Sequence, residues 1–389
     1  MAPPSLPHVD SLRDYGHAVA GHAGTLCDED GKLFIKPCTE KEINFYQTVQ
    51  REASDPDASK DKFRDLADII PVFMGTLMLA DPADQRIGEA VTGIISEAGG
   101  ITTDKTEIIA NVTEQIATAA AGAPQPDPAA EGAPPEPEWV PTNGGKIKTD
   151  TAIVLENMSH GFKKPNILDL KLGVRLHADN APAKKKQKME KLSAETTHGT
   201  HGFRIAGMKT YRGSDDPSQL DEDGFMIYDK DFGRTLVTED NLAGAVGKFV
   251  FNEAAGIDKE LGMAVCNGIA HEIDNMVHVL SEHELTMYSA SLLIVLEGEG
   301  EALRHAIQRN NEEAELWEKD PALAAKRVDS GIVLDEDGES FAGAEAPKMY
   351  SVKLIDFAHV DWAPGQGPDE NLLKGVRSVK DIFEELGRE

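Results

Sequence analysis

The sequence of 389 residues has little cysteine, few aromatic residues and no long apolar run, and these shortages exclude several classes of protein. The three cysteines, Cys27, Cys38 and Cys266, are odd in number and never form a Cys-x-x-Cys pair. They therefore indicate neither a disulfide framework nor a cysteine-built zinc site. No apolar segment approaches the roughly 18 residues of a membrane span. The N-terminus lacks the basic and then apolar layout of a signal peptide, so we expect localisation to the nucleus and cytoplasm.

Positive charge is also scarce over the chain as a whole. Lysine and arginine number 39 against 68 acidic residues, which gives a net charge of −29. Binding to nucleic acid needs a dominant positive field, so we expect no direct nucleic-acid partner. The exception is the region 163–212, where 12 basic residues stand against four acidic ones. A local basic region in an acidic protein predicts a small polyanionic ligand.

This basic region contains an apolar run that carries one carboxylate and one ammonium group. Asp169 and Lys171 lie two residues apart, and Gly173 ends the run. Residues two apart on a strand point to the same face, so the pair can meet a hydroxyl and a phosphate together. The alternative is an ion pair at the end of a surface strand, and the run alone does not separate the two interpretations.

A hairpin followed by a helix is expected near the N-terminus. Strand-like segments at 24–27 and 32–36 flank a turn, and Thr39 can cap the helix that follows. Lys36 ends the second strand, and Glu42 lies early in the helix. A strand lysine followed by a helical glutamate is typical of an ion pair that holds a nucleotide, although most lysines at strand ends are simply solvated.

Apolar segments at 69–77 and 151–158 are typical of buried strands. Between them, residues 119–147 consist mainly of Ala, Pro, Gly, Glu and Asp, and we expect a disordered insertion there. The second segment ends shortly before Pro165. We therefore expect it to form a hinge between two lobes, with backbone groups that can meet an adenine edge.

The helix expected at 184–192 is rich in lysine. Lys184, Lys188 and Lys191 share one side, and Lys185 and Lys188 are also spaced to share a side. Like charges this close destabilise a helix unless an anion relieves them. A solvated helix face or a nuclear-import signal is the commoner explanation of an isolated lysine run, and both remain open here.

Helices at 240–256 and 259–281 and strands at 285–296 and 350–359 are expected in the C-terminal half. An acidic insertion at about 297–348 separates the two strands. Asp356 emerges from the second strand directly before Phe357. A nucleotide-dependent phosphotransferase places its metal ligand at such a position. Nearby histidines lack the acidic partners of a zinc helix and are interpreted as structural: His271, His278 and His283.

With Lys36, Glu42, the expected hinge strand, the Asp169/Lys171 pair and Asp356 in that order, the chain resembles the inositol polyphosphate kinase family. Residues 165–173 match its Pro-x-x-x-Asp-x-Lys-x-Gly motif, residues 289–293 its serine-containing Ser-Leu-Leu strand, and residues 355–359 its Ile-Asp-Phe-Ala-His motif. The segment 195–209 looks most like the fungal inositol polyphosphate multikinases. The resemblance implies an α+β, two-lobed protein-kinase-like fold. Residues 1–158 would form a small antiparallel-sheet lobe that binds ATP, and residues 159–389 a larger α/β lobe for catalysis and inositol phosphate binding.

The resemblance also implies roles for individual residues. Asp169 and Lys171 would be catalytic, with Asp169 contacting the ribose or the attacking hydroxyl. ATP would be held by Lys36, Glu42, Glu156, Met158, Asp169 and Asp356. Mg²⁺ would be bound by Asp356 with help from Ser291. Inositol phosphates would be bound by Lys171, Lys185, Lys188, Lys209, Lys230 and His359.

The implied activity is ATP-dependent phosphorylation of inositol tris- and tetrakisphosphates towards the pentakisphosphate. Lysine point charges tolerate several substrate orientations, which favours a multikinase. An inositol hexakisphosphate kinase that makes pyrophosphates shares the same motifs. A third possibility is a nuclear regulatory scaffold that retains the kinase fold. We expect a monomer whose acidic insertions can contact protein partners.

Overall fold

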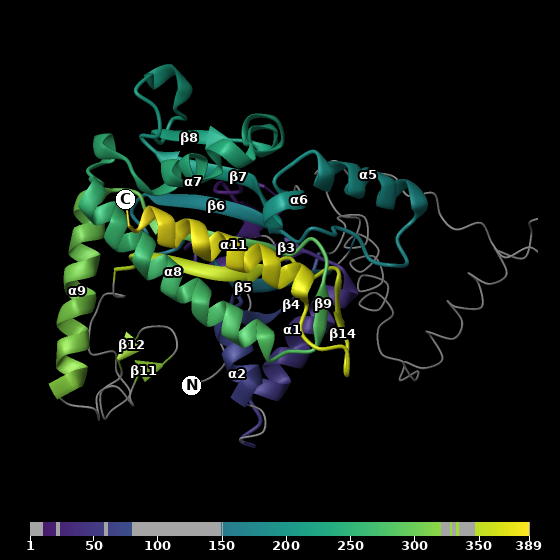
Figure 1. Cartoon of the computed structure of the whole chain (residues 1–389). Coiled ribbons are helices and arrows are strands. Elements are labelled where there is room, and N and C mark those ends of the chain that lie inside the picture. The colour runs from purple at the N-terminus through teal and green to yellow at the C-terminus, as the bar shows by residue number, and fades with distance from the viewer. Residues whose placement is uncertain are drawn as a thin grey trace, which may run out of the picture. The chain divides into compact units, whose positions relative to one another are not determined.

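The computed structural model describes residues 11–20, 24–57, 61–79, 149, 151–319, 327–328, 332–333 and 347–388. The insertion predicted at 119–147 lies outside these residues, as does part of the acidic insertion predicted at 297–348. Two five-stranded antiparallel sheets carry the functional segments (Figure 1).

The first sheet has the strand order β1-β2-β3-β5-β4. Its expected hairpin is present, because Leu26 pairs with Ile35 across the predicted turn. Thr39 caps the following helix by accepting a hydrogen bond from Glu42 N, as predicted. The elements are β1 (Arg13–Asp14), β2 (Leu26–Cys27), β3 (Leu33–Pro37), β4 (Phe73–Met78) and β5 (Thr151–Glu156), with helices α1 (Glu40–Ala53) and α2 (Asp61–Asp68).

The second sheet has the order β13-β10-β6-β7-β8 and places the Asp169/Lys171 segment on a central strand. Lys171 lies opposite Ser291 on one side and Arg204 on the other, so these three side chains share one sheet face. The opposite face belongs to the core through Leu168, Leu170 and Leu172. The strands are β6 (Pro165–Leu172), β7 (Phe203–Tyr211), β8 (Phe225–Tyr228), β10 (Ser291–Glu297) and β13 (Tyr350–Ile355).

Two long helices, α8 (Lys259–Ser281) and α11 (Glu370–Leu386), lie side by side and contribute many apolar residues to the core (Figure 1). The bounds of α8 agree with the sequence-based prediction. The remaining described helices are α5 (Ala183–Ala194), α6 (His198–His201), α7 (Leu242–Val250) and α9 (Gly300–Lys319). Short 3₁₀ segments are η3 (Pro217–Gln219), η5 (Glu239–Asn241) and η6 (Glu253–Ala255), and η4 (Phe232–Leu236) is a π-helical turn.

The prediction of a single strand at 285–296 is wrong, because the extended conformation is interrupted at Ser289. Strand β9 (Leu285–Met287) pairs with β14 (Val360–Trp362), whereas β10 begins only at Ser291. Ser289 has a φ of 59°, which cannot continue an extended ladder. The strand predicted at 350–359 likewise ends before Asp356, whose φ is 71°. Both breaks occur where the two strands lie beside each other, and they shape the candidate site.

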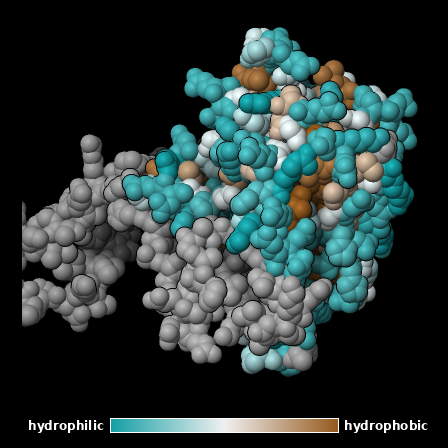
Figure 2. Space-filling model, turned by 90° about the vertical axis from the view of Figure 1, so that its left-hand side faces the viewer, coloured by the Kyte–Doolittle hydropathy of each residue, from teal (hydrophilic) through white to brown (hydrophobic). Residues whose placement is uncertain are grey.

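Two further pairs of residues in the described part of the 297–348 region form the short strands β11 (Arg327–Val328) and β12 (Ile332–Val333). Among the described residues, no helix has both the length and the apolarity to cross a membrane. The face drawn in Figure 2 is mainly hydrophilic, and its hydrophobic residues form separate small groups.

Candidate active site

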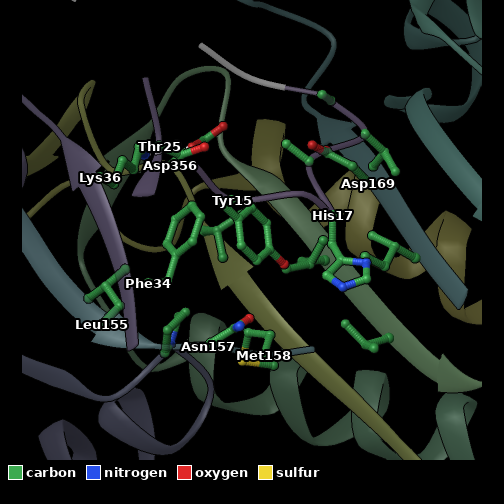
Figure 3. Close-up of a pocket in the computed structure, with 18 of the residues that line it drawn as sticks. Tyr15, His17, Thr25, Phe34, Lys36, Leu155, Asn157, Met158, Asp169 and Asp356 are labelled. Atoms are coloured by element: carbon green, nitrogen blue, oxygen red, sulfur yellow. Dashed lines mark hydrogen bonds and ion pairs between the residues drawn. The ribbon is translucent and has the colours of Figure 1, made fainter. Parts of the chain in front are cut away.

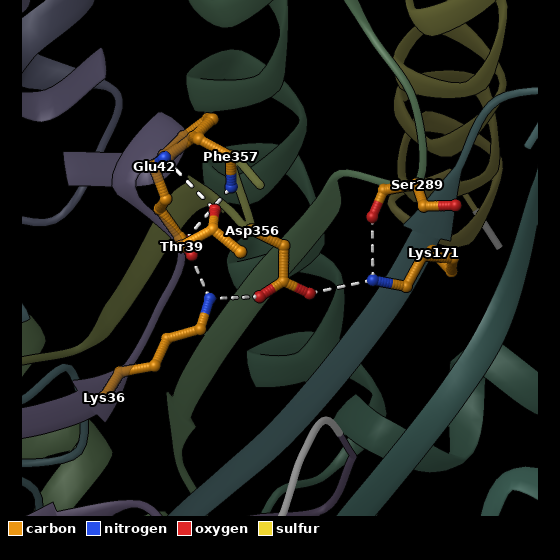
Figure 4. A network of polar contacts seen from close by, with 7 residues as sticks. All are labelled: Lys36, Thr39, Glu42, Lys171, Ser289, Asp356 and Phe357. Atoms are coloured by element: carbon orange, nitrogen blue, oxygen red, sulfur yellow. Dashed lines mark hydrogen bonds and ion pairs between the residues drawn. The ribbon is translucent and has the colours of Figure 1, made fainter. Parts of the chain in front are cut away.

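The centre of the candidate site is a carboxylate held between two lysines from different sheets (Figure 4). Asp356 Oδ1 lies 2.8 Å from Lys36 Nζ, and Asp356 Oδ2 lies 2.8 Å from Lys171 Nζ. Lys36 also donates to Glu42 Oε1 at 2.7 Å, and Phe357 N donates to the same oxygen at 3.2 Å. Four residues that the sequence singled out therefore form one continuous network.

Burial and charge act in opposite directions on this network. Burial alone would raise the pKa of Asp356, but Lys171 and Lys36 outweigh it and hold that pKa well below its usual range. Burial would lower the pKa of Lys36, but Asp356 and Glu42 raise it above its usual value. Glu42 is only 1% exposed, so its pairing with Lys36 compensates a nearly complete desolvation. Asp356 and Lys36 are therefore both charged at neutral pH.

Two backbone conformations at the site are uncommon for residues with a side chain. Asp356 and Ser289 both have positive φ values, which usually cost about 1–3 kcal/mol each. The turn at Ser289 directs its carbonyl oxygen to Lys171 Nζ at 2.8 Å. The turn at Asp356 places its carboxylate beyond the end of β13, between the lysines (Figure 4). The strained backbone thus positions the polar groups of the network.

Asp169 lies on the same face of β6 as Lys171 and is 6% exposed. Burial raises the pKa of Asp169, and Lys171 opposes that rise. Its Oδ1 has no hydrogen-bond partner among the described residues, and neither has Oγ of the fully buried Ser291. Buried polar atoms without partners are uncommon, and their free hydrogen-bonding capacity suits the binding of a ligand or ion. The oxygen atoms of Asp169, Ser291 and Asp356 suit a hard cation such as Mg²⁺.

A pocket between the two sheets opens beside this network (Figure 3). Lys36, Asp169 and Asp356 line one part of it. Glu156 and Met158, the predicted hinge residues, also line it. The lining further includes apolar residues from both sheets: Phe34, Leu155, Ile167, Leu293, Val295 and Ile355. An apolar pocket with a few charged groups at one end suits a nucleotide whose base is buried and whose phosphates meet the lysines.

A second group of cations gathers around His359. Lys185 Nζ from α5 lies 3.4 Å from His359 Nε2. Burial, followed by the charges of Lys185, Lys41 and Lys171, lowers the pKa of His359 to about 4. The sequence analysis missed Lys41, which projects from the start of α1 and pairs with Asp361 at 2.7 Å. This contact joins residues 320 positions apart in the sequence, and no local pattern could reveal that.

The other predicted substrate lysines have different environments. Lys188 is exposed on α5, which also carries the half-buried Lys185, and Lys230 is exposed just before η4. Lys209 is only 4% exposed, lies 3.5 Å from Asp221 Oδ2 and packs over the Phe225 ring at 4.3 Å. The structure thus brings Lys171, Lys185 and His359 together, whereas Lys209 already has a carboxylate partner.

Comparisons with known proteins agree with this geometry. The family model described as inositol polyphosphate kinase matches residues 152–384. The chain is 29% identical over 391 residues to inositol polyphosphate multikinase of Saccharomyces cerevisiae, covering 96% of this chain and 98% of the relative. It is 29% identical over 242 residues to inositol hexakisphosphate kinase 1 of Mus musculus, covering 60% of this chain and 51% of the relative.

A solved structure of the Saccharomyces cerevisiae inositol phosphate multikinase, in complex with ADP and Mn²⁺, is also similar. The TM-score is 0.50 at 24% identity, and the alignment covers 91% of this chain and 99% of the solved chain. This likeness confirms the predicted α+β kinase-like fold. Because the family model covers more than half of the chain, this protein belongs to the inositol polyphosphate kinase family.

Proposed function

We propose that this kinase transfers the γ-phosphate of ATP to hydroxyls of inositol tris- and tetrakisphosphates, towards the pentakisphosphate. The observation that carries the proposal is Asp356, which lies between Lys36 and Lys171 and lines a largely apolar pocket. The near-complete alignment with a yeast multikinase supports this substrate class over the hexakisphosphate, because the hexakisphosphate kinase matches only 60% of the chain.

In this proposal, the first sheet positions the nucleotide. Lys36 holds the α- and β-phosphates, and Glu42 keeps Lys36 in place through their 2.7 Å contact. The backbone around Glu156 and Met158 meets the adenine edge. Phosphoryl transfer needs positioning and charge neutralisation more than covalent chemistry, and a rigid ion-pair network supplies both.

Asp356 and Ser291 would hold Mg²⁺, with Asp169 close by. When bound, the ion neutralises charge on the phosphates of ATP. Lys36 and Lys171 contact both carboxylate oxygens of Asp356, so these ammonium groups already keep the carboxylate ionised and oriented. We propose Mg²⁺ as the resident ion of this site.

Asp169 and Lys171 act on the acceptor hydroxyl. The raised pKa of Asp169 makes this carboxylate a better proton acceptor than an exposed one, which suits removal of the hydroxyl proton. Lys171 contacts the transferring phosphoryl group from the same face of β6. Lys185, Lys188, Lys230 and His359 bind the remaining phosphates of the substrate, and we add Lys41, whose charge acts on His359. Lys209 binds a phosphate by exchanging its contact with Asp221.

The test is turnover by the full chain with ATP, Mg²⁺ and inositol 1,4,5-trisphosphate, with products separated by anion-exchange chromatography. We expect tetrakis- and pentakisphosphates. No turnover of any inositol phosphate would contradict the proposal. Pyrophosphorylated products from the hexakisphosphate as the main output would replace it with the hexakisphosphate kinase activity.

We further propose a monomer of the nucleus and cytoplasm, with protein partners at the acidic insertions. A scaffold role would use surfaces other than the kinase site. If the inactive Asp169→Ala variant fully replaced the wild type in cells, the scaffold role would be the important one.

A further inference from the structure

Residues 13–20, here called the N-terminal strap, cross the pocket from the first sheet to the second. At one end, β1 pairs with β2, and Tyr15 N donates to Thr25 O at 3.1 Å. At the other end, Val19 packs beside Met158 and its carbonyl oxygen lies over Gly207. A Cβ at Gly207 would lie 2.1 Å from that oxygen, so only glycine permits this approach.

Tyr15 is the residue of the strap that reaches into the pocket. Its ring meets the Phe34 ring edge-on, with centroids 4.9 Å apart, and both residues line the pocket. Figure 3 shows Tyr15 between the end that holds Lys36 and Asp356 and the end that holds Asn157 and Met158. The strap therefore lines the interior of the pocket as well as the rim of the pocket.

The Tyr15 hydroxyl is tied to the chain just after the hinge. It lies 3.1 Å from Ser159 Oγ. Asn157 Oδ1 accepts hydrogen bonds from Ser159 N at 3.0 Å and Ser159 Oγ at 2.9 Å, while Asn157 Nδ2 donates to Gly31 O at 2.7 Å. Since Ser159 gives its only hydroxyl proton to Asn157, Tyr15 must be the donor in the remaining bond. Burial raises the pKa of Tyr15 to about 12, so the phenol keeps this proton.

We propose that Tyr15 is a positioning residue of the nucleotide site, whose hydrogen bond to Ser159 latches the N-terminal strap over the pocket and limits nucleotide exchange. The inference rests on the nucleotide site proposed above. A nucleotide under the strap can leave only when the strap lifts, and lifting breaks the Tyr15–Ser159 bond. Because the latch forms with or without nucleotide, its loss speeds entry and departure alike and changes the equilibrium affinity little.

The experiment measures binding of a fluorescent N-methylanthraniloyl derivative of ADP with Mg²⁺ by stopped flow. Tyr15→Phe keeps the ring and removes only the donor, so the fold is retained. A single hydrogen bond corresponds to a change of about 2- to 10-fold in rate. We expect both the association and dissociation rate constants to rise by that factor, with Kd within about 2-fold of the wild type.

Ser159→Ala and the double variant complete a mutant cycle. We expect the double variant to exchange nucleotide no faster than Ser159→Ala alone, since Ser159→Ala already removes the acceptor of the Tyr15 bond together with the hydrogen bond to Asn157. Tyr228→Phe is the matched control, because its hydroxyl donates to Gly213 O at 3.4 Å, a residue outside the strap.

Three results would overturn the latch. They are wild-type exchange rates in Tyr15→Phe, a weaker Kd with an unchanged association rate, and multiplicative effects in the double variant. Failure of the wild-type protein to bind the ADP derivative would instead overturn the proposed nucleotide site itself.

Discussion

The two groups of cations at the site differ in how they are compensated. Lys36 and Lys171 are 17% and 24% exposed in their side chains and both contact Asp356. Lys185 has no ion-pair partner among the residues that the structure describes, and it faces His359, whose pKa is lowered partly by positive neighbours. Lys36 and Lys171 are balanced within the protein. Near His359, Lys41 pairs with Asp361, whereas Lys185 is left without a carboxylate partner among the described residues.

The compensated lysines suit a preorganised catalytic site, whereas the uncompensated lysine suits recognition of the substrate. Paired, buried charges keep one geometry before any ligand arrives, which is what phosphoryl transfer requires. Unpaired cations near the surface keep their attraction for a polyanion, and charge-assisted hydrogen bonds to phosphates replace the lost hydration. Substitutions in the first group should therefore affect rate and stability, and those in the second should affect substrate affinity.

The largest expected effect is that of Asp169→Ala. Loss of the proton acceptor should lower kcat by about 10²- to 10⁴-fold, in line with general-base contributions. The melting temperature should change little, because burial outweighs the attraction of Lys171 and raises the pKa of Asp169, so the ionised carboxylate adds no net stability to the fold. Steady-state kinetics and thermal unfolding measure the two quantities. An unchanged kcat would remove Asp169 from the proposed mechanism.

Lys36→Met tests whether the paired group supports stability. Among the described residues, the change leaves the buried Glu42 carboxylate with the Phe357 N–H as its remaining donor, while Asp356 keeps Lys171. Hydrogen bonds to charged groups contribute about 1.5–3 kcal/mol, so we expect the free energy of unfolding to fall by about that amount. Urea unfolding measures it, with Lys185→Met as the control. Equal stability of the two variants would contradict the expected difference between the paired Lys36 and the unpaired Lys185.

Lys185→Met tests the unpaired group. We expect KM for inositol trisphosphate to rise about 10-fold, equivalent to about 1.4 kcal/mol, with kcat and KM for ATP nearly unchanged. The charge is lost from substrate binding but not from the Asp356 network. A fall in kcat without a change in KM would place Lys185 at the transferring phosphoryl group instead.

The smallest expected effect is proton uptake by His359. Its pKa of about 4 in the free protein leaves it neutral at pH 6, since burial and then the nearby cations disfavour the charged form. A bound polyphosphate reverses the local potential and raises that pKa, so binding should take up a fraction of a proton and strengthen as the pH falls. Calorimetry at pH 6 in buffers of different ionisation enthalpy measures the uptake. His359→Gln should show less uptake than the wild type, because the substrate's own phosphates contribute equally in both.

Local signals in the sequence predicted the elements well where short-range chemistry decides them. Thr39 capped its helix, and α8 ran from Lys259 to Ser281 as its apolar spacing indicated. The failure at Ser289 has a clear cause. An apolar run predicts a continuous strand. In the structure the chain turns at Ser289, and the Ser289 carbonyl accepts a hydrogen bond from Lys171, which lies 118 residues earlier in the sequence. A local pattern contains no information about such a contact.

By itself, the sequence determined which charged residues exist, their order in the family motifs and the basic region within an acidic chain. Only the tertiary structure decided that Asp356 lies between Lys36 and Lys171, that Lys41 joins the cations at His359, and that Lys209 is buried beside Asp221. The physical reason is that sheet register and two backbone turns set these distances, and they depend on packing between segments hundreds of residues apart.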